Sequence, residues 1–265
     1  MDKNTFLIAL CGKSGCGKST VSHMLNKLYG WKSISSYTTR PPRYENEPDH
    51  IFISNEEFDR IPDDNMVAYT EFDGNRYCAT TEQVENAQVY VIDPAGIETL
   101  KNRYHGTKKI LVVQIDAPDK ILEQRMRKRG DSWSKIADRL QHDRIAFRDV
   151  QYDFYIDTSN QPISQVTVQI AEYVNRYMAI DGWLKKIGMP ALNPTEIDEY
   201  STGQLLEAAK KLDCISDFDQ WQYLQALCDT VIPLNIALQV CNMLHENDIS
   251  VTDLHSEASD QYYTH

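Results

Sequence analysis

Hydrophobic residues in the first 180 positions follow two alternating patterns. Short apolar runs, of the kind found in strands buried on both faces, lie at 6–10, 88–92, 110–115 and 154–156. Apolar residues with helical spacing predict helices over 20–29, 118–129, 133–148 and 163–178. Strands that alternate with helices predict an α/β fold in which helices cover both faces of a parallel sheet.

The pattern changes after residue 180. Residues 182–194 contain two glycines and two prolines, which is typical of a linker. Three more helical patterns follow, over 202–212, 217–230 and 233–246. We therefore expect one α/β domain over 1–180, a linker over 181–200 and a small acidic all-α domain over 201–265.

Charge separates the same two parts of the chain. The 265 residues carry a net charge of −12, and residues 191–265 contain only two basic side chains, Lys210 and Lys211, against thirteen acidic ones. This acidic segment argues against nucleic acid or an anionic membrane as a partner, and we expect neither. Its apolar stripes indicate either a bundle that packs on itself or on the first domain, or a surface for an oligomer or a protein partner.

Overall composition is that of an ordinary globular protein. Hydrophobic residues make up 42% of the chain and charged residues 25%, which is typical of a soluble protein with a core. The longest apolar run, residues 6–11, is far shorter than the ~20 residues that span a membrane. The six cysteines show no zinc-binding spacing, so we expect reduced thiols and a cytoplasmic location.

Residues 12–19 read Gly-Lys-Ser-Gly-Cys-Gly-Lys-Ser and match the pattern G-x-x-x-x-G-K-[S/T] of a triphosphate-binding loop. The backbone N–H groups of such a loop bind phosphate oxygens, and the helix that follows adds its positive end. Lys18 should reach the β- and γ-phosphates, and the Ser19 hydroxyl should ligate Mg²⁺. The candidate ATP-binding residues are Gly12, Ser14, Gly15, Cys16, Gly17, Lys18, Ser19 and Thr20.

A second group of motifs follows the loop in a set order. Residues 35–43, Ser-Ser-Tyr-Thr-Thr-Arg-Pro-Pro-Arg, place Arg40 and Arg43 where both guanidinium groups can converge on one phosphate. Asp-His-Ile-Phe-Ile-Ser at 49–54 and Glu-Phe-Asp-Gly-Asn-Arg-Tyr at 71–77 come next. Together with the phosphate loop, these motifs resemble the guanylate kinase family of nucleoside monophosphate kinases, over residues 6–158.

This resemblance implies a phosphate-loop core, an insert that binds the acceptor over residues 33–85 and an arginine-rich lid over 125–148. It implies ATP with Mg²⁺ as the donor and a nucleoside monophosphate as the acceptor. His50 stands where the family usually has a tyrosine, and its charge would make acceptor binding sensitive to pH. The acceptor-binding positions implied are Ser36, Arg40, Arg43, His50, Glu71, Tyr77 and Asp93.

The resemblance assigns catalytic roles to Lys18 and to three lid residues, Arg125, Arg129 and Arg139. Phosphoryl transfer depends on positioning and on neutralisation of negative charge, so it requires no general base from the protein. A mobile lid supplies that charge only when it is closed. The other basic residues of the lid either line the site or form a solvated helix face: Arg127, Lys128, Arg144 and Arg148.

The positions that read the base depart from the family. Ala68 falls where the family has a glutamate that binds guanine, and Ala79 falls where it has a serine or threonine. Cys78 replaces the glycine between, and Glu71 substitutes for the lost glutamate only if the strand shifts its register. The sequence is therefore consistent with guanylate kinase activity or with a relaxed or altered base preference, deoxynucleotides included.

Two other classes of function stay open. Guanylate-kinase-like domains also serve as non-catalytic binding modules, although Lys18 and the lid arginines are retained here. Loss of the base-reading side chains would also suit a kinase for a non-nucleotide phosphate such as a sugar phosphate. The stretch Phe-Asp-Gly-Asn-Arg-Tyr at 72–77 argues against that second alternative.

Overall fold

The computed structural model describes residues 5–42, 44–45, 47, 50–186 and 193–196. Contacts divide the chain into a unit of residues 2–171 and a second unit that contains Met1 and residues 172–265. The three helices expected beyond residue 200 and the acidic domain they would form lie outside the described residues, as does Arg43.

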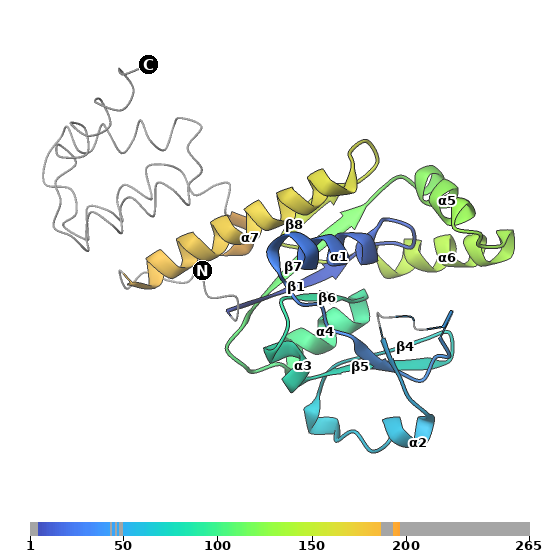
Figure 1. Cartoon of the computed structure of the whole chain (residues 1–265), viewed down its shortest axis with the longest axis horizontal. Coiled ribbons are helices and arrows are strands. Elements are labelled where there is room, and N and C mark those ends of the chain that lie inside the picture. The colour runs from blue at the N-terminus through green and yellow to red at the C-terminus, as the bar shows by residue number, and fades with distance from the viewer. Residues whose placement is uncertain (1–4, 43, 46, 48–49, 187–192, 197–265) are drawn as a thin grey trace, which may run out of the picture. The chain divides into compact units, whose positions relative to one another are not determined.

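A parallel sheet forms the centre of the first unit (Figure 1). Its strands are β1 (Phe6–Cys11), β6 (Val89–Val91), β7 (Lys109–Asp116) and β8 (Phe154–Asp157), in the order β6-β1-β7-β8. Every residue of β1 is buried, so helices and loops cover both faces at the centre of the sheet. The α/β fold with a parallel sheet, predicted from the apolar runs, is confirmed.

The four helices predicted in the first 180 residues are present, with ends that shift by a few residues. They are α1 (Lys18–Tyr29), α5 (Asp119–Lys128), α6 (Trp133–Ala146) and α7 (Ile163–Lys186). The expected end of the last helix at residue 178 is wrong, since α7 continues eight residues further and passes through Gly182. A glycine inside a helix costs only about 1 kcal/mol, so it does not end a long helix by itself. Residues 181–186 are therefore helical and are not part of a linker, and a short 3₁₀ turn, η2 (Pro194–Glu196), follows.

A second sheet lies beside the first and was not apparent in the hydrophobic pattern (Figure 1). Its strands are β2 (Ser36–Thr38), β3 (His50–Phe52), β4 (Met66–Phe72) and β5 (Asn75–Thr80), in the order β3-β2-β5-β4. Strands β4 and β5 form a hairpin whose turn, Asp73-Gly74, has positive φ at both residues, as a two-residue hairpin turn requires. Short helical segments surround it: α2 (Asn55–Phe58), η1 (Asp63–Asn65) and α3 (Thr81–Glu85).

One further helix, α4 (Pro94–Arg103), was also not predicted. Its start is defined by Asp93, whose Oδ1 accepts a hydrogen bond from the backbone N–H of Gly96 at 2.7 Å. Pro94 occupies the first turn, where a missing N–H has no helical partner to lose. Pro94 and Gly96 lie close together, which is typical of a loop. Here Asp93 and Pro94 instead begin a helix.

Candidate functional site

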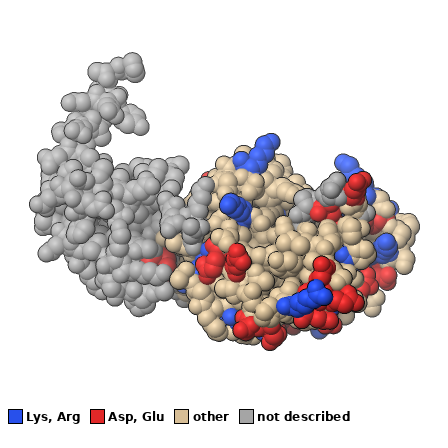
Figure 2. All heavy atoms as spheres, turned by 60° about the horizontal axis from the view of Figure 1, so that its bottom comes forward, with Lys and Arg blue, Asp and Glu red and all other residues tan. Residues whose placement is uncertain are grey.

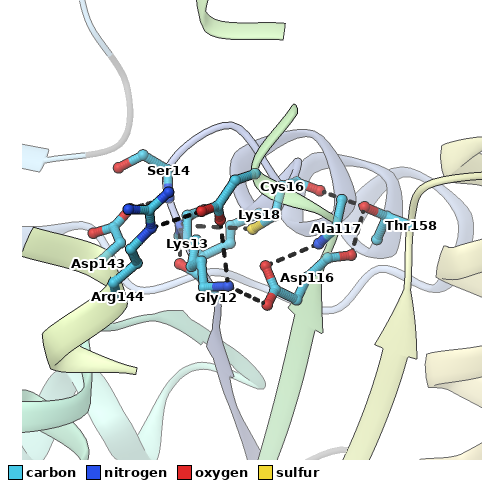
Figure 3. Close-up of polar contacts among 11 residues, drawn as sticks. Gly12, Lys13, Ser14, Cys16, Lys18, Asp116, Ala117, Asp143, Arg144 and Thr158 are labelled. Carbon is cyan, nitrogen blue, oxygen red and sulfur yellow. Dashed lines mark hydrogen bonds and ion pairs between the residues drawn. The ribbon is translucent and has the colours of Figure 1, made fainter. Parts of the chain in front are cut away.

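The phosphate loop joins β1 to α1 at the carboxyl end of the main sheet, which is where α/β proteins bind ligands. Gly12 has φ 150° and Gly17 has φ 105°, values that favour glycine. A Cβ on Gly12 would also collide with the carbonyl oxygen of Ile115. The Lys18 ammonium donates to the carbonyl oxygens of Gly12 at 2.6 Å and Lys13 at 3.1 Å, so it lies across the turn (Figure 3).

All eight predicted ATP-binding residues therefore lie in this one turn and the start of α1. Ser19 and Thr20 are exposed in the first turn of the helix, and Gly17 forms its N-cap. No acidic side chain occupies that first turn, so the partial positive charge of the helix end is not neutralised there. The geometry suits an anion at the loop and a cation at the Ser19 hydroxyl.

Residues at the carboxyl ends of β7 and β8 contact the loop (Figure 3). Lys13 pairs with Asp116 at 2.9 Å. Burial alone would lower the pKa of Lys13, but its hydrogen bond with Asp116 raises the pKa overall, so the ammonium stays charged. The buried hydroxyl of Thr158 lies 3.0 Å from the carbonyl oxygen of Asp116 and 3.3 Å from that of Cys16, and it donates toward both.

A carboxylate that the motifs did not indicate also contacts the loop. The backbone N–H of Ser14 donates to Oδ2 of Asp143, on α6, at 2.6 Å. The other carboxylate oxygen lies 3.3 Å from Nδ1 of His142. Asp143 is four residues after Arg139, and residues four apart share a helix face, so its position on the lid helix was the available signal.

The three predicted catalytic arginines do not converge on the phosphate loop in this structure. Arg125 donates to the hydroxyl and the carbonyl oxygen of Thr158, at 2.9 and 2.6 Å, and so reaches the residue beneath the loop. Arg129 and Arg139 instead both pair with Asp131, in the turn between α5 and α6. Arg129 is the C-cap residue of α5, and its neighbour Asp131 neutralises it locally.

The other lid residues contact groups on the helices themselves. Arg127 pairs with Glu123 at 2.6 Å and its guanidinium lies 3.5 Å from the centroid of the Trp133 ring. Arg144 pairs with Asp119 at 2.8 Å and thereby joins α6 to α5. Both side chains are largely exposed, as expected of a solvated helix face.

The second sheet brings together three of the predicted acceptor-binding residues, Ser36, His50 and Tyr77. Ser36 lies opposite His50 in the register of β2 and β3, and the Ser36 hydroxyl is 3.0 Å from Nδ1 of the imidazole. The rings of His50 and Tyr77 meet edge to face at 5.7 Å. Tyr90 of β6 also hydrogen-bonds to Ser36, and burial raises the pKa of its phenol. Tyr90 was not predicted, because its apolar neighbours in β6 gave it no signal of its own.

Arg40 lies on the loop after β2 and is held by a buried carboxylate. Its guanidinium donates to Glu47 at 2.7 and 3.3 Å and to the carbonyl oxygen of Pro41 at 2.8 Å. It also lies 5.3 Å from the centroid of the Phe52 ring. The Glu47 side chain is 3% exposed, so the pair is positioned firmly beside the second sheet.

The two remaining acceptor candidates have local partners. Glu71 lies opposite Arg76 in the β4–β5 hairpin and accepts a hydrogen bond from the Tyr69 hydroxyl. Asp93 caps α4 through one oxygen, and it is close enough to Tyr90 for its charge to help raise the pKa of that phenol.

The positions that would read a base are apolar and closed. Ala68 and Ala79 lie opposite each other in the hairpin and are 1% and 0% exposed. They belong to a hydrophobic cluster with Val67 and Val84, and Cys78 beside them is also buried. Burial raises the pKa of the Cys78 thiol to about 12, so it is neutral near neutral pH.

The described residues were also searched for a metal-binding group and for a membrane-spanning helix. Among them, no group of three or more His, Cys, Asp or Glu side chains could hold a metal ion, and no helix is long and apolar enough to cross a membrane. The cysteines in this part of the chain, Cys11, Cys16 and Cys78, are free and buried. On the face of the described residues that Figure 2 shows, acidic and basic side chains are interspersed.

Comparison with known proteins places the fold and site in a family. A family model described as an AAA domain matches residues 8–151. The guanylate kinase of Bartonella henselae is 31% identical over 185 residues, which cover 64% of this chain and 83% of the relative. That of Synechocystis sp. is 31% identical over 181 residues, covering 63% and 93%. A crystal structure of guanylate kinase from Anaplasma phagocytophilum aligns with a TM-score of 0.48 and 20% identity, over 66% of this chain and 86% of that one.

A parallel sheet whose first strand leads into a glycine-rich loop and a helix defines a phosphate-loop nucleotide-binding protein. Relatives at 31% identity align with the chain over most of their length, and the domain model matches more than half of it. The chain belongs to the guanylate kinase family, as the sequence motifs indicated, and thus to the nucleoside monophosphate kinases, a class of phosphotransferase.

Proposed function

We propose that this chain transfers the γ-phosphate of ATP to a nucleoside or deoxynucleoside monophosphate, with relaxed or altered preference for the base. The observation that carries the proposal is the phosphate loop. Its glycines have the backbone conformation that an anion-binding turn requires, and Lys18 lies across it between two carbonyl oxygens. In such loops this lysine contacts the β- and γ-phosphates of the donor, so its retention favours an enzyme over a binding module without the loop.

The loop fits a nucleoside triphosphate with its cation. Gly12 packs so closely against the backbone of Ile115 that a side chain there would displace the loop from the end of the sheet. Magnesium is bound in such sites by few protein groups together with phosphates and waters, and the exposed Ser19 hydroxyl would supply the protein ligand. When bound, Mg²⁺ neutralises charge on the β- and γ-phosphate oxygens.

The acceptor's phosphate would bind at the second sheet. Arg40 supplies a fixed positive charge, and Ser36, His50 and Tyr77 supply hydrogen-bonding groups next to one another. Arg43 would add the second guanidinium. Glu71 and Asp93 would face the nucleoside part of the acceptor, as the family resemblance implies.

Transfer would require the lid arginines to change partners. Arg125 is already hydrogen-bonded to a residue that contacts the loop, whereas Arg129 and Arg139 would have to leave Asp131. A bound phosphate carries more negative charge than one carboxylate and accepts the same bidentate hydrogen bonds, so it can replace Asp131 as their partner. The arginines would then neutralise the negative charge of the phosphoryl group during its transfer, and the closed lid would exclude water from it.

The proposed base preference follows from the apolar pair Ala68 and Ala79. A site that hydrogen-bonds its substrate rejects analogues by ~10⁴–10⁵, whereas an apolar pocket discriminates by only ~10–200-fold. These two alanines and Cys78 are buried, and they offer no carboxylate or hydroxyl at the positions where the family reads guanine. Several bases should therefore be accepted at comparable rates.

The experiment is a panel of acceptors incubated with ATP and Mg²⁺, with ADP release and the phosphorylated product both measured. The panel holds the ribo- and deoxynucleoside monophosphates and, as a separate class, sugar phosphates. Formation of nucleoside diphosphates supports the proposal. Turnover only with a sugar phosphate would overturn the nucleotide assignment, and no turnover with any acceptor would indicate a binding module.

A further inference from the structure

The contact between Asp143 and the phosphate loop brings a carboxylate to the place where a phosphate should bind. Backbone N–H groups of a glycine-rich loop bind anions because their dipoles converge on one point. Here the N–H of Ser14 already donates to Oδ2 of Asp143 at 2.6 Å, a short, charge-assisted distance (Figure 3). An anion of the chain itself thus occupies one of the loop's donors.

Asp143 is buried, and the loop is its strongest partner. Its side chain is only 8% exposed, and no lysine or arginine among the described residues pairs with it. Its hydrogen bonds go to the Ser14 N–H and, at 3.3 Å, to the imidazole of His142. A buried carboxylate is unfavourable unless hydrogen bonds replace its lost water, so this contact with the loop stabilises the observed position of α6.

The same part of α6 also contacts the second sheet. The ring of His142 meets the ring of Phe72, at the end of β4, edge to face with centroids 4.8 Å apart. Two consecutive residues of the lid helix therefore hold it against the phosphate loop on one side and against the β4–β5 hairpin on the other. Bound triphosphate would place further negative charge beside the Asp143 carboxylate. Neighbouring like charges repel strongly when they are shielded from water.

We propose that Asp143 is an internal competitor of the donor, whose carboxylate occupies the phosphate loop in the resting chain and must leave before ATP binds. The inference rests on the proposed function, since it assigns the donor to this loop. Displacement of Asp143 moves α6 and with it the His142–Phe72 contact, so donor binding also loosens the lid from the hairpin. Donor affinity is then the intrinsic affinity of the loop multiplied by the fraction of chains in which it is free.

The test is the dissociation constant of MgADP and of a non-hydrolysable MgATP analogue, measured by calorimetry on the full chain. Asp143→Ala should tighten both by about 10-fold to 150-fold, the range for loss of one hydrogen bond to a charged group. Asp143→Asn keeps an acceptor oxygen but not the charge, so its constants should fall between those of wild type and Asp143→Ala. Asp138→Ala is the matched control, because it removes an exposed aspartate from the same helix and should change neither constant.

Each outcome decides between defined alternatives. Tighter binding in both Asp143 variants, with the control unchanged, supports the inference. Equal constants in all four proteins, or weaker binding in the Asp143 variants, overturns it, and weaker binding would make Asp143 part of the donor site. Should Asp143→Ala fail to fold, the Asn variant, which keeps size and shape, decides alone. If wild type binds neither nucleotide, or if Lys18→Ala binds as well as wild type, the proposed function fails instead.

Discussion

The guanidinium of Arg125 donates twice to Thr158, to its hydroxyl at 2.9 Å and to its carbonyl oxygen at 2.6 Å. Thr158 is fully buried, and its hydroxyl also points toward the carbonyl oxygen of Cys16 in the phosphate loop. The pair therefore connects the predicted lid to the phosphate loop through two side chains. Among the three predicted catalytic arginines, Arg125 is the one that the structure places next to the loop.

Arg125→Ala should lower kcat more than it raises the KM for ATP. Loss of one group that stabilises transition-state charge typically costs ~10²–10³ in kcat. Arg127→Ala is the matched control, since Arg127 lies on the same helix but binds Glu123 on an exposed face. Steady-state kinetics of both variants provides the measurement. An equal loss in the two variants would show that Arg125 acts only through the general charge of the lid.

The acceptor pocket should select weakly among bases. Because Ala68 and Ala79 supply no hydrogen-bonding side chain at the family's base-reading positions, values of kcat/KM for the different nucleoside monophosphates should lie within about 200-fold of one another. The acceptor panel provides the values. A thousandfold preference of the wild type for GMP would contradict this expectation and would direct attention to Glu71, whose carboxylate accepts a hydrogen bond from Tyr69 near the turn of the hairpin.

The substitution Ala68→Glu together with Ala79→Ser should move the preference toward GMP or dGMP. A hydrogen bond to a charged group contributes ~1.5–3 kcal/mol, so kcat/KM for guanine relative to the other bases should rise by a corresponding factor. Both positions belong to a hydrophobic cluster, so the new carboxylate should lower the free energy of unfolding of the acceptor-free chain. Denaturant unfolding would measure the free energy of unfolding of the variant. The loss should be seen without GMP and should be smaller when GMP is bound.

Stability should fall at alkaline pH because of the buried thiol of Cys78. Burial raises the thiol pKa from 9.0 to about 12 in the folded chain. The folded state thus favours the neutral thiol: this stability is complete below pH 9 and is lost as the pH rises toward 12. Cys78→Ala removes the titrating group, so its free energy of unfolding should decline less over that interval. Parallel declines in variant and wild type would contradict the linkage.

The main sheet was predictable because its strands are buried on both faces. β1 is a continuous apolar run and β7 contains one over residues 110–113, and short runs of this kind are typical of strands buried on both faces. The second sheet gave no comparable signal: β2 and β3 are three residues long, and β3 has no buried residue. The Asp73-Gly74 turn was the one local indication of the hairpin.

The phosphate loop could be predicted from sequence as a unit because all its parts lie within eight residues. The contacts that surround it could not. Ser14 and Asp143 are 129 positions apart, and Arg125 and Thr158 are 33 apart, so their meeting depends on the packing of α5 and α6 on the sheet. The resemblance to the family predicted that the lid arginines would lie close to the phosphate loop. In the structure, Asp131 pairs with two of them, Arg129 and Arg139, in the turn between α5 and α6.

The most direct test of the proposed kinase reaction uses two lysines of α1. Wild type, Lys18→Ala and Lys27→Ala are incubated with ATP, Mg²⁺ and the preferred nucleoside monophosphate, and phosphorus NMR follows the nucleoside diphosphate formed. Lys27 is exposed in the last turn of the helix, away from the loop, so its variant should match wild type. Lys18→Ala should lose turnover by about 10² or more while keeping the wild-type circular dichroism spectrum. Equal diphosphate formation by Lys18→Ala and wild type would show that this loop does not hold the donor.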